Sequence, residues 1–166
     1  MILAPAASLA VALALAPSVL AAPPTHQPSA PLEPLEFAPG EMCEDGLIQD
    51  VTSARMRTSQ FVLRDGTIRE VTRGSATSVL INTSTGEQFE AKGGGRFSLE
   101  FRTDGSLVAD ASGVVFTWYY PGDPSELGPG AWVVMGNVHE AYDPDGTLVE
   151  ATFNGRAVNA CDLVGA

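Results

Sequence analysis

The chain has 166 residues and a formal net charge of −11, with 20 acidic side chains against 9 basic ones. Its length fits one domain with a short appendage. The acidic balance argues against nucleic acid as a partner, because phosphate binding needs lysine and arginine to release counterions. It also argues against a negatively charged membrane surface, which attracts basic segments.

The N-terminal stretch has the pattern of an export signal. Residues 2–20 are almost wholly apolar, and small residues follow at Ala21 and Ala22. This pattern predicts a secretory signal peptide over residues 1–21, although no lysine or arginine precedes the apolar run. A membrane anchor is the alternative, but Pro5 and Pro17 interrupt a run already short for a span of about 20 residues. We therefore expect a secreted, extracellular protein with no membrane span after cleavage.

Residues 22–42 contain six prolines without a helical or strand period. This composition predicts an extended, solvated linker ahead of a domain over residues 43–166. Cys43 precedes the first predicted strand and Cys161 follows the last. Since exported proteins meet an oxidising environment, we expect these two cysteines to form a disulfide. A reactive thiol is the alternative, but neither cysteine has a basic sequence neighbour or a CxxC partner to lower its pKa.

From Gly46 onward the sequence alternates between strand-like runs and tight turns. The clearest strand covers residues 96–102, where Phe97, Leu99 and Phe101 alternate with polar residues, as in a half-buried strand. Paired turn residues, which supply the positive φ of hairpin turns, occur at Asp65-Gly66, Thr85-Gly86, Asp104-Gly105, Asp145-Gly146 and Asn154-Gly155. Weaker breaks fall at Gly74, Gly93-Gly94-Gly95 and Gly113. No helical stripe of ten or more residues follows residue 43.

These signals predict an all-β fold. The expected strands are 47–54, 56–64, 67–72, 75–82, 87–92, 95–102, 106–111, 113–120, 131–142 and 147–159, some of which should merge to leave about eight or nine. Consecutive hairpins favour an antiparallel up-and-down β-barrel of about eight strands. A β-sandwich is the alternative, because both architectures bury one face of each strand.

Two of the predicted strands are apolar on both faces. In residues 113–120, Phe116 and Trp118 share one face, while Val115 and Tyr119 share the other. Residues 131–142 show the same property. A barrel strand needs only one buried face, so the second face is expected either to be covered by the linker, a loop or another subunit, or to line a ligand cavity.

The longest loop, residues 121–130, joins these two strands and is flanked by aromatic residues. Aromatic side chains with a polar tip are favoured at binding surfaces, and loops at a barrel mouth are where ligands enter. The residues predicted to bind are Trp118, Tyr119, Tyr120 and Trp132. The alternative is ordinary core packing beside a connector stiffened by proline.

Catalytic and metal-binding signals are weak. His139, the only histidine of the domain, lies beside Glu140 and is the candidate acid–base group. No nucleophile elbow and no zinc-ligand spacing accompany it. The segment 143–146 has the chemistry of a turn rather than of a calcium loop. We expect no cofactor, no metal and no catalytic residues.

The turn motifs resemble those of small secreted actinobacterial proteins of unknown function. The similarity rests on residues 79–87, 103–106 and 153–156, on Gly136, and on Cys161-Asp162-Leu163 near the C-terminus. It implies an antiparallel barrel that is lipocalin-like or allene-oxide-cyclase-like in general look, and it carries no activity with it.

The leading hypothesis is a secreted, non-enzymatic protein that binds a small apolar ligand or a surface partner. One alternative is a barrel-mouth enzyme, an isomerase or hydrolase using His139, Glu140 or Tyr119. The other is a structural protein of the cell envelope that associates through its doubly apolar strands.

Overall fold

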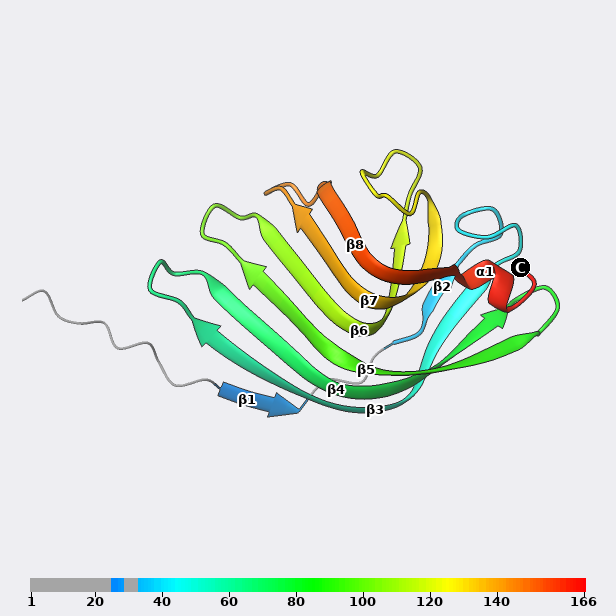
Figure 1. Ribbon diagram of the computed structural model, residues 1–166, viewed down its shortest axis with the longest axis horizontal. Coiled ribbons are helices and arrows are strands. Elements are labelled where there is room, and N and C mark those ends of the chain that lie inside the picture. The colour runs from blue at the N-terminus through cyan, green and yellow to red at the C-terminus, as the bar shows by residue number, and fades with distance from the viewer. Residues whose placement is uncertain (1–24, 29–32) are drawn as a thin grey trace, which may run out of the picture.

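Six long strands, each antiparallel to its neighbours in the sheet, make up most of the described chain (Figure 1). The computed structural model describes residues 25–28 and 33–166, so the predicted signal peptide over residues 1–21 lies outside the described residues. The long strands are β3 (Leu47–Val62), β4 (Ile68–Asn82), β5 (Gln88–Phe101), β6 (Leu107–Tyr119), β7 (Gly130–Tyr142) and β8 (Leu148–Asn159). They pair in sequence order, which confirms the predicted all-β, antiparallel, up-and-down fold.

Two short strands and one short helix complete the described elements. The strands β1 (Thr25–Pro28) and β2 (Leu35–Phe37) both pair with β3, although they fall within the stretch expected to be a linker. Phe37 of β2 is buried in the core, so this part of the proline-rich segment belongs to the folded body. The helix α1 (Ala160–Leu163) follows β8 directly.

The sheet is an open, curled half-barrel, and the described residues show no pairing between β3 and β8 that would close a barrel (Figure 1). Both edges already have partners. On β3, β1 and β2 occupy parts of the edge. On β8, the backbone N–H of Ala151 donates to the carbonyl of Pro124 at 3.1 Å, and Ser125 forms a bridge with Ala151. The 121–130 loop therefore caps the strand edge that closure would require.

A row of glycines crosses the sheet where its strands bend. Gly74, Gly95, Gly113, Gly136 and Gly155 are paired one with the next from β4 to β8. A Cβ on any of them would collide with backbone of the neighbouring strand, so only glycine fits. The breaks expected at Gly74, Gly95 and Gly113 are therefore bends inside continuous strands, which is why pairs of predicted strands merge. The turn predicted at Asn154-Gly155 was wrong for the same reason, because both residues lie inside β8.

Past the glycine row, toward the C-terminal end of β6, the sheet divides into two halves. The ladder between β5 and β6 runs only from Gly95↔Gly113 to Phe101↔Leu107, whereas β5 stays paired with β4 and β6 with β7 along their whole lengths. The half formed by β3, β4 and β5 thus separates from the half formed by β6, β7 and β8. At this end the two halves face each other across a core.

That core contains the disulfide. Cys43 and Cys161 are bonded, as predicted, across a sequence separation of 118 residues. They pack among buried residues of both halves, including Leu47 and Leu80 on one side and Val133 on the other. Phe37, Phe116 and Trp118 add three mutually tilted aromatic rings with centroids 5.7–6.4 Å apart. The second face of β6 is therefore covered in part by the segment expected to be a linker.

The C-terminal residues are held by a buried amide. Asn82, fully buried at the end of β4, donates its side-chain N–H groups to Asp45 and to the backbone carbonyls of Val164 and Gly165. Its oxygen accepts from the backbone N–H groups of residues 84 and 85. Because buried polar groups are costly when unpaired, this network fixes the tail after α1 against the β4–β5 turn.

Candidate functional site

The inner face of the curled sheet is a trough. On the ladder, Glu140 of β7 pairs with Ala109 of β6, eight residues before Thr117. A straight strand would separate those positions by about 26 Å. The Thr117 hydroxyl nevertheless donates to Glu140 Oε1 at 2.9 Å. The strands therefore bend so far at the glycine row that the two ends of one face come into contact.

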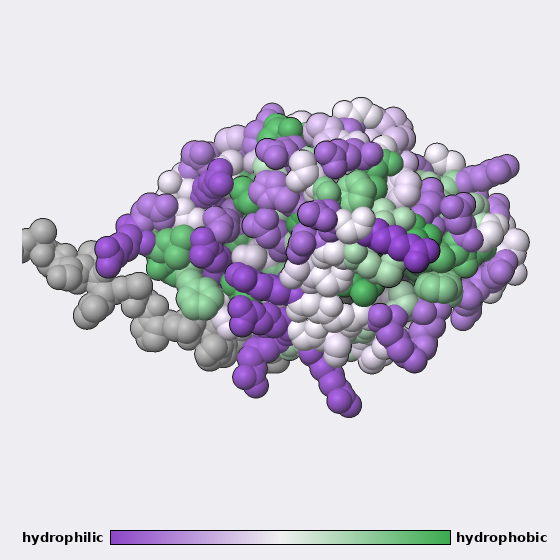
Figure 2. All heavy atoms as spheres, viewed as in Figure 1, coloured by the Kyte–Doolittle hydropathy of each residue, from purple (hydrophilic) through white to green (hydrophobic). Residues whose placement is uncertain are grey.

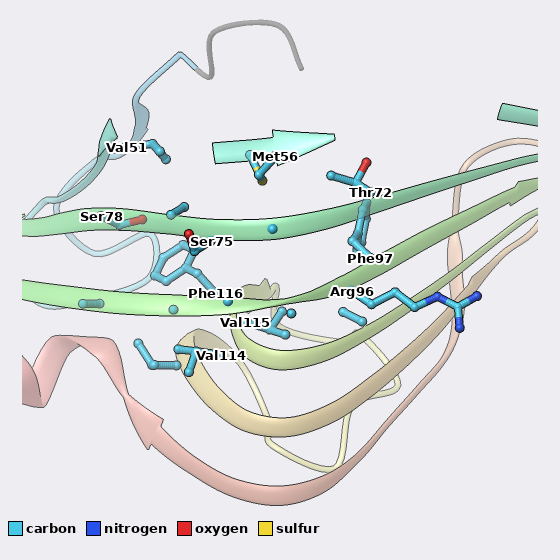
Figure 3. Close-up of a pocket in the computed structure, with 18 of the residues that line it drawn as sticks. Val51, Met56, Thr72, Ser75, Ser78, Arg96, Phe97, Val114, Val115 and Phe116 are labelled. Carbon is cyan, nitrogen blue, oxygen red and sulfur yellow. The ribbon is translucent and has the colours of Figure 1, made fainter. Parts of the chain in front are cut away.

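Two adjoining pockets form this apolar trough. One, of about 480 Å³, is lined by Phe97 and Leu99 of β5, by Ala109 and Val115 of β6, and by Glu140 and Tyr142 of β7, among others. The other, of about 250 Å³, lies where the two halves of the sheet separate. Both pockets share the lining residues Phe97, Ala111, Val115 and Phe116. Figure 3 shows Met56, Thr72 and Phe97 from β3 to β5 gathered with Val115 and Phe116 of β6.

The apolar side chains of the trough are unusually accessible. On β5, the strand with the clearest alternation, Phe97 and Phe101 are each 42% exposed, whereas Ser98 on the opposite face is 6% exposed. Phe101 also belongs to a cross-strand row that runs through Val62, Ile68, Phe101, Leu107 and Tyr142. Figure 2 shows apolar residues reaching the surface on this view, including the region where β3 turns into β4. Apolar surface gathered in a concavity marks a binding site.

A polar cluster lies within the trough. Glu140 accepts hydrogen bonds from three hydroxyls: Thr117 and Tyr119 donate to Oε1, both at 2.9 Å, and Tyr142 donates to Oε2 at 2.8 Å. The carboxylate is thus held in one orientation. A carboxylate oxygen carries two lone pairs, and Oε2 has one protein donor. The cluster can therefore accept one more hydrogen bond, from a hydroxyl or N–H group of a bound molecule.

The tyrosines of this cluster resist ionisation. Burial, aided by the charge of Glu140, raises the pKa of Tyr119 from its ordinary 10.0 to about 12. Burial and the same charge raise the pKa of Tyr142 as well. Near neutral pH both groups are therefore neutral donors.

The raised pKa values of these tyrosines predict that the folded protein loses stability at alkaline pH. A pKa raised in the folded state means that the folded protein holds a proton which the unfolded chain releases near pH 10. The free energy of unfolding should therefore fall as the pH rises from about 10 through about 12. Urea unfolding across that range should show the fall, and Tyr119→Phe should reduce its slope. If all tyrosinate absorbance of the native protein developed near pH 10, the prediction would be wrong.

The structure distributes the four predicted binding residues over different surroundings. Trp118 and Tyr120 line the larger pocket. Tyr119 is 2% exposed and contributes its hydroxyl to Glu140. Trp132 packs in a second core with Leu127 of the loop and donates from Nε1 to the carbonyl of Gly128 at 3.2 Å. The loop thus covers the second apolar face of β7, which is one of the expected roles.

His139 lies on the opposite face of the sheet. Its Nδ1 is 2.8 Å from Asp110 Oδ1, its cross-strand partner on β6, and the pair is partly exposed. Glu140 and Tyr119 face the trough instead. The three residues of the enzyme hypothesis are therefore not brought to one place. Within the described ranges, no three histidine, cysteine or acidic side chains gather as metal ligands.

Several residues that line the trough were not among the binding residues predicted from the sequence. Phe97 and Leu99 were expected on the buried face of a half-buried strand, and Tyr142 was not among the predicted binding residues. The pattern did place Phe97, Leu99 and Phe101 on one face. What it lacked was the bend, which leaves that face accessible and brings Tyr142 and Glu140 opposite Thr117.

No protein-family model matches this chain, and no curated protein or solved structure matches it either. Among the described residues, none of the helices is long and apolar enough to cross a membrane.

Proposed function

We propose that this chain is a secreted, non-enzymatic binding protein that holds a small apolar molecule in the trough. The observation that carries the proposal is the exposure of Phe97 within a concave, mainly apolar pocket. Extracellular location is supported by the predicted signal peptide and by the disulfide, since disulfides persist in oxidising compartments.

The polar cluster narrows the ligand class. A molecule whose apolar body covers Phe97 and Leu99 would carry a hydroxyl or N–H group toward Glu140 Oε2. A carboxylate end would be disfavoured, because the oxygens of Glu140 would repel it. The expected ligand is therefore a neutral apolar molecule with one hydrogen-bond donor, of a size that suits about 480 Å³.

A charged residue in the trough should weaken this binding. The uncharged fluorescent probe N-phenyl-1-naphthylamine should bind the wild-type protein, and Phe97→Asp should weaken binding by about tenfold or more, because an apolar ligand would desolvate the carboxylate. Since Phe97 is 42% exposed, its replacement should change stability much less than replacement of a core residue. Fluorescence titration and urea unfolding measure the two effects.

Met135→Asp is the matched control, because Met135 is 40% exposed on β7 and does not line either pocket of the trough. Both substitutions place the same poor strand former in a long strand. Equal probe binding by wild type and the Phe97 variant would contradict the proposal. Native mass spectrometry of protein purified from its host's medium would then test for a bound surface partner instead.

A further inference from the structure

The sheet carries a second candidate site on the face opposite the trough. Arg57, Arg73 and Arg96 are directly paired on β3, β4 and β5. Because side chains alternate along a strand, they point to the face opposite their neighbours Thr72 and Phe97, and Arg96 also borders the smaller pocket of the trough. Figure 3 shows the Arg96 side chain extending away from the cluster around Phe116.

Placing these three arginines together is unfavourable in isolation. Directly opposed cross-strand residues have Cβ atoms only about 5 Å apart, and like charges at that spacing destabilise a sheet. In the part of the chain that the structure describes, no carboxylate forms an ion pair with Arg57, Arg73 or Arg96. The protein has 9 basic residues against 20 acidic ones, so this concentration of positive charge opposes its overall balance.

A fourth arginine joins them around a pocket of about 360 Å³. Arg69, two residues before Val71 and on the same face of β4, pairs with Glu100 at 2.6 Å. Its Nε atom is buried and has no hydrogen-bond partner. The floor between the arginines is apolar and includes Phe61, Leu63 and Val71. The pocket thus combines several guanidinium groups with an apolar surface.

From this arrangement we propose that the four arginines form a binding site for an anionic group, a phosphate or similar oxyanion, that carries an apolar substituent. Guanidinium groups bind oxyanions through paired, charge-assisted hydrogen bonds. The anion offsets the repulsion between Arg57, Arg73 and Arg96, and the apolar substituent rests on Phe61 and Val71. The site lies on the opposite face of the sheet and shares only Arg96 with the lining of the smaller pocket of the trough.

Titration with inorganic pyrophosphate, followed by calorimetry, tests the anion site. The wild-type protein should bind it saturably, and binding should weaken with added salt. The double variant Arg57→Gln/Arg73→Gln should bind at least about tenfold more weakly, because it lacks two charge-assisted contacts. Arg73→Lys, which keeps the charge but not the planar fork, should give an intermediate loss. Arg156→Gln, which removes one positive charge from the exposed part of β8, should bind like wild type.

The stability of the variants distinguishes an anion-binding role of the arginines from a purely structural role. Without anion, the double variant should unfold in urea at the same or a higher midpoint than wild type, because repulsion is relieved. Absence of saturable binding, or equal loss in Arg156→Gln, overturns the proposal, as does a lowered midpoint with unchanged binding. Sedimentation with phosphatidylglycerol but not phosphatidylcholine vesicles assigns the anion to a lipid headgroup. Pyrophosphate binding without vesicle binding assigns it to a free small molecule.

Discussion

Replacing Cys43 and Cys161 together by alanine should lower the free energy of unfolding by about 4 kcal/mol. The bond closes a loop spanning 118 residues of sequence, so its loss restores considerable freedom to the unfolded chain. Both cysteines are also buried between the two halves of the sheet. The measurement is urea unfolding of the oxidised protein, the double variant and the protein under reducing conditions.

The reduced wild-type protein is the control for cavity effects, because it loses the bond but keeps both sulfur atoms. It should lose most of the stability that the double variant loses. A change below about 1 kcal/mol in both would show that the core around Leu47, Leu80 and Val133 holds the two halves together without the bond.

Substituting one glycine of the cross-sheet row should have a comparable effect. In Gly113→Ala, the new Cβ would collide with the carbonyl oxygen of Gly94 and approach the Cα of Gly95 at 2.9 Å. The backbone there has φ +116°, which side chains other than glycine rarely adopt. Overpacking against backbone together with this strain should cost about 3 kcal/mol or more. Thermal and urea unfolding would measure the loss.

Gly86→Ala separates the cost of overpacking against backbone from the cost of a positive φ. Gly86 has φ +75° but nothing within 4 Å of the position of a Cβ, so it should cost only about 1 to 2 kcal/mol. Gly113→Ala should also weaken probe binding in the trough, since the bend brings Thr117 to Glu140. Equal destabilisation by the two variants would mean that close approach between strands does not make the row require glycine.

Much of the fold could be predicted from local sequence. Asp-Gly pairs have one dominant use, the hairpin turn, and those at Asp65-Gly66, Asp104-Gly105 and Asp145-Gly146 lie in such turns. Isolated glycines are ambiguous, because positive φ serves both a turn and a bend within a strand. Gly74 and Gly113 were therefore expected to end strands, and their true role depends on pairing with Gly95 and Gly136.

Less of the candidate sites could be predicted from the sequence. Alternation shows which residues of one strand share a face, as with Phe97 and Phe101, but not whether that face is filled. Contacts such as Thr117 with Glu140 depend on the curvature of the whole sheet. The arginine row depends on register, because Arg57, Arg73 and Arg96 are unremarkable until their strands are aligned.

The strand order has a consequence for the path of folding. From β3 to β8, every ladder joins strands that are neighbours in sequence, so each hairpin can form from local contacts, which favours rapid folding. The cystine is the opposite kind of contact, since it joins residues 118 positions apart. Cys161 lies within α1, which follows β8, so the bond spans all the hairpins from β3 to β8. Because the local contacts of these hairpins do not involve the bond, we expect the strands to pair without it and the bond to stabilise the assembled sheet.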